Sequence, residues 1–284
     1  MSLTLDMVVF GGDKRQIYVA KSLAEKGYSV GTYRLSEAVP TKNCTELHAL
    51  DEIFDRCGVL IGPIPFIKNL LPVEQLIPAF ERRLTKRHLL TGGVIPPALM
   101  QFCAQNEIAC HDFMRSERVA ILNAIATAEG AVFEAIEASS INLHGSNCLV
   151  LGYGRCGKIL AEKLKGLSAK VTVAARSEEA LAFAEASGLR PVRLSAFKDR
   201  LPDYDFIFNT VPALILDDDC LALLKAETVI IDIASAPGGV DYDAATKRQR
   251  NAKLCLGLPG KVAPKASADI LVDEIMMILE KRGG

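Results

Sequence analysis

The chain contains the stretch Cys148-Leu149-Val150-Leu151-Gly152-Tyr153-Gly154-Arg155-Cys156-Gly157-Lys158, and this stretch decides its fold. An apolar run ends at Gly152, and a G-x-G-x-x-G pattern follows with glycines at 152, 154 and 157. Residues 159–164 then place apolar side chains at helical spacing. A strand, a glycine turn and a helix in this order form the context in which the pattern binds a dinucleotide. The plainer alternative is a glycine turn in an α/β core that binds nothing.

Each glycine of the pattern has its own physical role. Gly152 permits the tight turn out of the strand, and Gly154 lets the backbone approach a pyrophosphate closely. Gly157 allows the helix to pack closely on the strand. The first N–H groups of that helix and its dipole both favour an anion at this end. We therefore expect the turn to hold the diphosphate of a nicotinamide nucleotide.

The end of the next strand bears on which nucleotide binds. A site that prefers NAD usually places Asp or Glu there, on the ribose 2′-hydroxyl. Here the strand ends in Arg176-Ser177, a pair that suits a 2′-phosphate, although Glu178 and Glu179 follow directly. We expect NADP rather than NAD. The predicted cofactor residues are Gly152, Tyr153, Gly154, Arg155, Cys156, Gly157, Arg176, Ser177, Asn209, Thr210 and Val211.

The composition limits the classes of protein that this chain can be. Of its 284 residues 50% are apolar, and the formal net charge of -1 comes without a basic face or tail, which argues against nucleic acid. No apolar run reaches the ~18 residues that span a membrane. The eight cysteines form no C-x-x-C pair, which is typical of reduced thiols in a cytoplasmic protein. The four histidines are scattered, so we predict no metal site.

Alternating strand and helix patterns predict two Rossmann-like α/β domains with parallel sheets and a cofactor cleft between them. We assign residues 1–117 to an N-terminal, substrate-side domain and 118–284 to the dinucleotide-binding domain. A C-terminal helix over 266–279 could pack back on the first domain. Further strands are predicted within 7–10, 28–33, 59–65, 89–93, 108–112, 170–177, 206–212, 229–235 and 253–261.

A long helix over 117–139 is predicted to join the two domains. Its residues fall on one stripe at steps of three or four, a pattern typical of a helix that packs one face. The stripe comprises Val119, Leu122, Asn123, Ala126, Gly130, Phe133 and Ile136.

The first domain carries its own polar turn between a strand and a helix, Gly11-Gly12-Asp13-Lys14-Arg15-Gln16. Ligands of parallel α/β sheets bind at this edge, so Lys14 and Arg15 could hold an anion or a substrate carboxylate. The alternative is a solvated turn.

Six stretches spread along nearly the whole chain carry a further signal: Gly11-Gly12-Asp13-Lys14-Arg15-Gln16, Ala128-Glu129-Gly130-Ala131, the glycine fingerprint, Asn209-Thr210-Val211-Pro212, Asp232-Ile233-Ala234-Ser235 with 237–241, and Gly257-Leu258-Pro259-Gly260-Lys261-Val262-Ala263-Pro264-Lys265. Together they resemble the family of dipicolinate synthase A subunits. Two of them are far more selective than the glycine fingerprint, namely Pro237-Gly238-Gly239-Val240-Asp241 and the segment that begins at Gly257.

The resemblance implies a nicotinamide-nucleotide subunit that works with a flavoprotein-like B subunit. Together they would oxidise a dihydrodipicolinate, derived from a lysine-pathway intermediate, to dipicolinate during sporulation. It also implies a cytoplasmic protein of the bacterial mother cell, and a homo-oligomer is compatible with it. The resemblance assigns no catalytic residue.

A dicarboxylate substrate calls for two cationic sites, and we expect Lys14, Arg15 and Lys261 to supply them. The candidates for a general base are Asp13, Glu129 and Asp241, which the sequence does not rank. Oxidation of a dihydropyridine is favoured by aromatisation, so the protein mainly has to position the substrate and accept a proton.

Two alternatives stay open. The first is an NAD(P)-dependent dehydrogenase of the 2-hydroxyacid or alanine dehydrogenase type. Against it, Ser235-Ala236-Pro237-Gly238 replaces the Arg-Gly of the hydroxyacid enzymes, and no histidine follows His144. The second alternative is a protein that binds NADP without catalysing a reaction.

Overall fold

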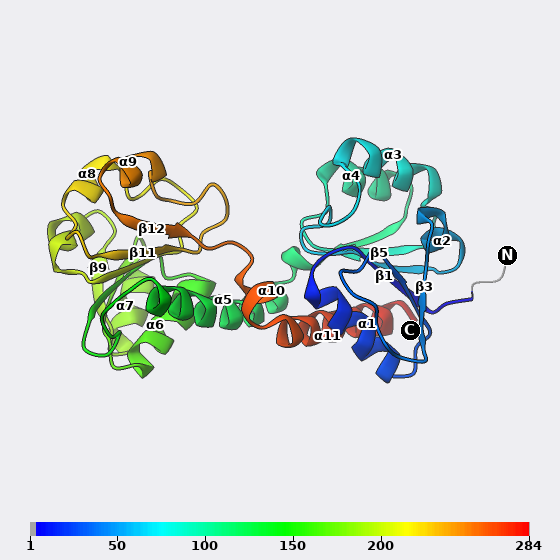
Figure 1. Ribbon diagram of the computed structural model, residues 1–284, viewed down its shortest axis with the longest axis horizontal. Coiled ribbons are helices and arrows are strands. Elements are labelled where there is room, and N and C mark those ends of the chain that lie inside the picture. Colours follow the sequence, from blue (N-terminus) through cyan, green and yellow to red (C-terminus); the bar gives the residue numbers. More distant parts are fainter. Residues whose placement is uncertain (1–3, 284) are drawn as a thin grey trace. The chain divides into compact units, whose positions relative to one another are not determined.

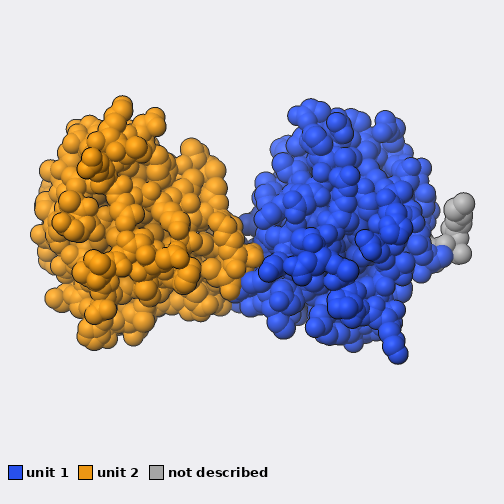
Figure 2. All heavy atoms as spheres, in the orientation of Figure 1, with its two compact units in different colours: residues 1–122, 263–284 blue, residues 123–262 orange. Residues whose placement is uncertain are grey.

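The computed structural model describes residues 4–283, which form two compact units. Unit 1 comprises residues 1–122 together with 263–284, and unit 2 comprises residues 123–262 (Figure 2). Helix α5 (Glu117–Glu137) carries the chain from unit 1 into unit 2. The predicted fold class, two parallel-sheet α/β domains joined by a long helix, is confirmed.

Unit 1 is built on a six-stranded parallel sheet in the order β3-β2-β1-β4-β5-β6. The order reverses direction between β1 and β4, which makes this pair the topological switch point. The strands are β1 (Met7–Phe10), β2 (Val30–Tyr33), β3 (Cys44–Glu46), β4 (Val59–Ile61), β5 (Leu89–Gly92) and β6 (Ala109–Asp112). The helices are α1 (Lys14–Glu25), α2 (Leu50–Asp55), α3 (Val73–Arg83) and α4 (Pro97–Gln105), with a 3-10 turn η1 (Phe113–Arg115).

Each face of this sheet buries its own core. One face packs an aromatic cluster in which Phe10, Phe66 and Phe80 contact one another edge-on or tilted. The other face packs α1 together with α11 (Pro264–Gly283), the last helix of the chain, which lies beside α1 (Figure 1). The C-terminal helix therefore supplies part of the core of unit 1.

Unit 2 repeats this architecture with the order β12-β11-β10-β7-β8-β9, all parallel. Its switch point lies between β7 and β10. The strands are β7 (Asn147–Leu151), β8 (Lys170–Ala175), β9 (Arg190–Arg193), β10 (Phe206–Asn209), β11 (Val229–Asp232) and β12 (Asn251–Leu254). The helices are α6 (Arg155–Gly166), α7 (Glu178–Ala186), α8 (Asp218–Ala222), α9 (Tyr242–Lys247) and α10 (Leu258–Val262), with a 3-10 helix η2 (Phe197–Asp203).

The stripe predicted for α5 is wrong in its second half. Phe133 and Ile136 are each 55% exposed, whereas Ala128, Ala131 and Ala135 are buried in the core of unit 2. Small side chains let the helix approach its neighbours closely, as at Gly130 against Leu258. By length and composition α5 is the one described helix apolar enough to cross a membrane, a test that the core helices of globular proteins also pass.

The last strand and its exit turn, predicted together over 253–261, also need correction. β12 ends at Leu254, and residues Leu258–Val262 form the short helix α10. The edge strands β3 and β9 were not predicted from the sequence. They are short and only partly buried, so they lack a clear apolar run.

Candidate nucleotide site and the polar turn of unit 1

The glycine turn of unit 2 follows β7 at the switch point, where ligands of such sheets bind. A Cβ on Gly152 would collide with the Thr210 side chain, and one on Gly157 would collide with the carbonyl oxygen of Gly152. Gly152 also has φ +92°, a conformation that favours glycine. A Cβ on Gly154, in contrast, would meet nothing within 4 Å. The turn is tightly packed behind Gly152 and Gly157 and open at Gly154.

Helix α6 begins directly after this open glycine. Its N-cap residue is Gly154, which has no side chain to accept a hydrogen bond from the first turn, and that turn carries no acidic residue. The positive end of the helix therefore carries no carboxylate of its own. This arrangement suits an external anion such as a pyrophosphate.

The loops after β10 and β11 are fixed by the buried carboxylate of Asp232. One of its oxygens accepts hydrogen bonds from Asn209 Nδ2 (2.9 Å) and Ala234 N (3.0 Å). The other accepts from Gly239 N (2.7 Å) and from the hydroxyl of Tyr242 (2.9 Å), and the pKa of Tyr242 is raised by burial and by this carboxylate. Sequence reasoning did not assign Asp232 this role. The loop predicted to face the nicotinamide is thus held rigidly.

Asn209 and Thr210 have structural partners. Asn209 Oδ1 accepts from Val211 N at 3.0 Å, and the Thr210 hydroxyl donates to Leu151 O at 2.9 Å. The first contact holds the turn after β10, and the second joins this turn to the end of β7 at the switch point. Their predicted contact with the cofactor stays a prediction.

At the other end of the predicted site, Arg176 and Ser177 follow β8. Arg176 is exposed, while the Ser177 hydroxyl accepts a hydrogen bond from Ala180 N (3.2 Å) and caps α7. Arg193, which the sequence did not single out, pairs in register with Ala175 and forms an ion pair with Glu178. Two guanidinium groups therefore belong to the neighbouring carboxyl ends of β8 and β9. No motif could have identified Arg193, because β9 itself was not predicted.

The turn of unit 1 is closed by its own side chains. Asp13 Oδ1 accepts a hydrogen bond from Arg15 N (3.1 Å) and caps α1. The Arg15 guanidinium, only 9% exposed, donates to both oxygens of Asp13 (2.9 Å each) and to Ile64 O (2.7 Å). Lys68 pairs with the same carboxylate at 2.9 Å. The binding of a substrate carboxylate by Arg15 stays a prediction, but in the structure its guanidinium already pairs with the Asp13 carboxylate.

The candidate bases differ in their surroundings. Burial alone would raise the pKa of Asp13, but the hydrogen bonds and charge of Arg15, with Lys68, lower it to about 2. Glu129 is exposed and forms an ion pair with Lys163 (2.8 Å), and Asp241 caps α9 by accepting from Ala244 N (2.9 Å). Each of the three carboxylates has a structural partner, and Asp13 is too acidic for an effective base near neutral pH.

The predicted substrate cations belong to both units. Lys14 is exposed at the start of α1 in unit 1, and Lys261 is exposed on α10 in unit 2. Neither forms an ion pair within residues 4–283. Both have a charged group available to an anion, and their role in substrate binding stays a prediction.

Comparison with known families divides the chain into two matched parts. Residues 6–114 match the N-terminal domain of the dipicolinate synthase A subunit. Residues 115–251 match the NAD binding domain of D-isomer specific 2-hydroxyacid dehydrogenases. Unit 2 therefore carries a nicotinamide-nucleotide-binding domain of the dehydrogenase type.

Individual proteins match over almost the full length. The dipicolinate synthase A subunit of Bacillus subtilis (strain 168) is 32% identical in an alignment of length 288 that covers 97% of this chain and 96% of that protein. The crystal structure of the dipicolinate synthase A subunit from Bacillus halodurans has a TM-score of 0.86 and 31% identity, covering 98% of this chain and 99% of that one. The Bacillus subtilis crystal structure has a TM-score of 0.84 and 28% identity, covering 99% and 97%.

Proposed function

Because the chain belongs to the family of dipicolinate synthase A subunits, we propose that it oxidises a dihydrodipicolinate to dipicolinate with NADP as the hydride acceptor. One observation carries the proposal beyond the family. The glycine turn of unit 2 is open at Gly154 and leads into a helix whose N-cap has no side chain. This end of the helix favours an anion, and a dinucleotide diphosphate has the negative charge and the oxygen acceptors for its free N–H groups.

The residues of unit 2 fit the cofactor at several points. The open turn would take the diphosphate, while Arg176, with Arg193 beside the same strand ends, would take a 2′-phosphate. The rigid loop of Asn209, Thr210 and Val211 would lie along the nicotinamide half. When bound, the nicotinamide ring would supply the hydride acceptor. NADP rather than NAD is favoured by the absence of Asp or Glu at the end of β8.

The remaining chemistry is positioning and proton transfer. The substrate loses a hydride from ring carbon and a proton, and it becomes an aromatic pyridine. Lys14 and Lys261 are exposed cations that could orient the two carboxylates. Glu129 and Asp241 are better candidates than Asp13 to accept the proton, because the pKa of Asp13 is about 2.

The reaction in our proposal also involves a B subunit of the flavoprotein type and takes place in the cytoplasm of a sporulating bacterial mother cell. The relatives are named as A subunits, which supports the existence of a partner. All eight cysteines are free, which supports a reducing compartment.

Two measurements test the proposal. Titration of the purified chain with NADP and with NAD should show tighter binding of NADP, and Arg176→Asp should reverse this preference. Turnover of dihydrodipicolinate, followed at 340 nm, should appear with the B subunit present. Equal affinities in wild type and variant would remove Arg176 from the site, and binding without turnover would reject the catalytic role.

A non-catalytic nucleotide-binding role is the second candidate, and one observation favours it. All three carboxylates predicted as bases are engaged in a cap or an ion pair. Under this alternative the B subunit would carry the reaction and this chain would only bind NADP. Substituting Glu129 and Asp241 by Asn or Gln separates the two, because only a catalytic chain would lose turnover while nucleotide affinity stayed constant.

A further inference from the structure

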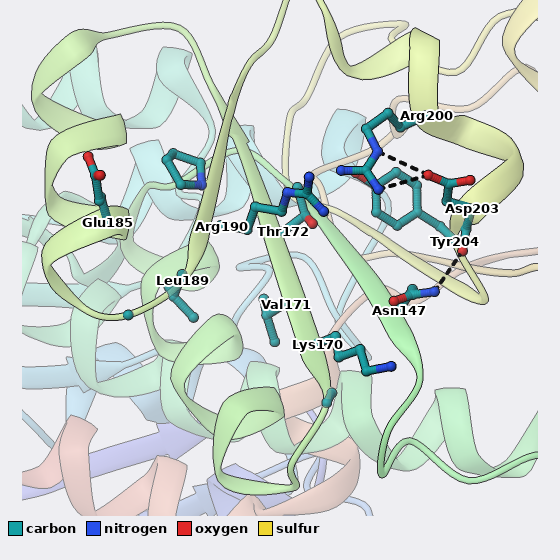
Figure 3. Close-up of a pocket in the computed structure, with 13 residues that line it drawn as sticks. Asn147, Lys170, Val171, Thr172, Glu185, Leu189, Arg190, Arg200, Asp203 and Tyr204 are labelled. Atoms are coloured by element: carbon teal, nitrogen blue, oxygen red, sulfur yellow. Dashed lines mark hydrogen bonds and ion pairs between the residues drawn. The ribbon is translucent and has the colours of Figure 1, made fainter.

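A cavity lies in unit 2, away from the glycine turn. Its volume is about 540 Å³, and it opens where three strands begin, at Asn147 of β7, Lys170 of β8 and Arg190 of β9 (Figure 3). The glycine turn follows the opposite end of β7, after Leu151. The cavity is therefore separate from the predicted nucleotide site, and its volume lies in the range of small-molecule pockets.

Positive charge predominates along this cavity. Lys170 and Arg190 both line it, and neither forms an ion pair within the described part of the chain. Arg200 of η2 lines it too and pairs with Asp203 at 2.9 Å. Glu185 of α7 is the other carboxylate on its wall. Three cations therefore line the cavity with two carboxylates, and two of the three cations are guanidinium groups.

A buried hydroxyl at the cavity wall has no partner. Tyr204 is 2% exposed, and its Oη makes no hydrogen bond to any described residue. Its backbone is fully engaged, because its N–H donates to Leu201 O and its carbonyl accepts from the Thr228 hydroxyl at 2.9 Å. A buried hydroxyl without a partner is rare and destabilising in a protein interior.

Residues with polar donors from several elements thus line one hollow. In Figure 3 Arg190 lies beside Thr172, its register partner on β8, and Arg200 is joined to Asp203, the residue before Tyr204. Guanidinium groups bind carboxylates and phosphates through paired N–H donors. We propose that this cavity binds a small organic anion bearing carboxylate or phosphate groups, with Arg190 and Arg200 as its main contacts and Tyr204 as a further donor.

The test uses the full chain with citrate and inorganic phosphate as probes in separate titrations by calorimetry. We expect at least one probe to bind, and Arg190→Ala and Arg200→Ala each to weaken it by about tenfold or more. Lys198→Ala is the matched control, because Lys198 lies on the same 3-10 helix, also pairs with an aspartate and does not line the cavity. Comparing the two probes shows whether carboxylate or phosphate is preferred.

A second variant separates binding from folding. Tyr204→Phe removes the hydroxyl that lacks a partner, so it should raise the melting temperature of the free protein. The same variant should bind the anion more weakly than wild type. An anion held instead at the glycine turn would bind Arg190→Ala and Arg200→Ala as tightly as wild type, and this result would overturn the proposal. So would the failure of both probes to bind wild type at ~10 mM.

Discussion

The two units place a glycine turn at the same point of the same topology. In unit 1 the turn follows β1, in unit 2 it follows β7, and each lies at the switch point of a six-stranded parallel sheet. In unit 1 a Cβ on Gly11 would collide with Leu70 and with the carbonyl oxygen of Lys68. Gly152, at the matching position of unit 2, is blocked in the same way by Thr210. The two turns differ two residues further on, where unit 1 has Asp13 and unit 2 has Gly154, on which a Cβ would meet open space. Topology alone therefore does not make a binding site.

The difference lies in what satisfies the helix that follows each turn. The first turn of α1 is capped by the Asp13 carboxylate, which Arg15 and Lys68 hold in place. The first turn of α6 has no side-chain cap at Gly154. Unit 1 thus carries its own anion at the position where unit 2 has no side chain and leaves room for the anion of a ligand. The following predictions alter one turn at a time, from the largest expected effect to the smallest.

The loop that closes the turn of unit 1 contributes Lys68 and Leu70 against Gly11, and its Phe66 is fully buried beside Gly62 and Gly92. Phe66→Ala should lower the free energy of unfolding by about 3–5 kcal/mol, since it leaves a large cavity. Urea unfolding followed by circular dichroism measures this loss. The exposed Phe183→Ala of unit 2 is the control and should cost well under 1 kcal/mol. An equally small loss for Phe66→Ala would show that this side chain does not anchor the loop.

The open turn of unit 2 can be given a carboxylate like that of unit 1. Gly154→Asp should lower the affinity for NADP by ~100-fold or more. The new carboxylate repels the diphosphate and accepts the N–H hydrogen bonds that the diphosphate would otherwise accept. The fold should persist, since Gly154 has φ -84° and free space around its Cα. Gly154→Ala adds the carbon without the charge and should bind NADP at an intermediate level. Unchanged affinity in the Asp variant, measured by calorimetry, would place the diphosphate elsewhere.

The charge of Asp13 should make the stability of unit 1 depend on pH. Its folded pKa of about 2 lies below the ordinary 3.8, so the carboxylate stabilises the fold above pH ~4 and loses this effect as the pH falls towards 2. Asp13→Asn should therefore cost about 2 kcal/mol at pH 7, and the difference from wild type should shrink between pH 4 and 2.

Asp217 provides the comparison for that experiment. It also caps a helix, and hydrogen bonds from Cys220, with Lys198, lower its pKa to about 2, but its side chain is 44% exposed. Asp217→Asn should lose less stability than Asp13→Asn because solvent screens an exposed charge. Urea unfolding at several pH values compares them, and equal losses would contradict the importance of burial at Asp13.

The smallest effect is expected at Arg193. Arg193→Ala should lower the affinity for NADP a few-fold and leave the affinity for NAD unchanged, because only NADP has a 2′-phosphate for this guanidinium to bind. Parallel titrations with the two nucleotides measure the ratio. Lys165→Ala, on α6 in the same unit, should alter neither affinity. A loss for both nucleotides would indicate a structural role for Arg193.

The sequence was informative where local patterns coincide with buried structure. The glycine fingerprint, the apolar strands and the long α5 could be predicted because each has its own spacing of residue types. The exposed Phe133 and Ile136 were misassigned, since the alanine face of α5 packs more closely than a larger face could. Side-chain partners between distant segments could not be predicted either. Neither the contact of Arg15 with Ile64 nor that of Asp232 with Tyr242 leaves a local signal.

The packing of α11 on α1 has a consequence for synthesis of the chain. Unit 1 is discontinuous, so the ribosome makes all of unit 2 before it makes the helix that covers one side of the first sheet. Met7 of β1 and Val19 and Leu23 of α1 contribute to the core that this helix completes, and until then part of this core is exposed to water. Unit 2, although encoded second, is therefore the part of the nascent chain that can finish folding first.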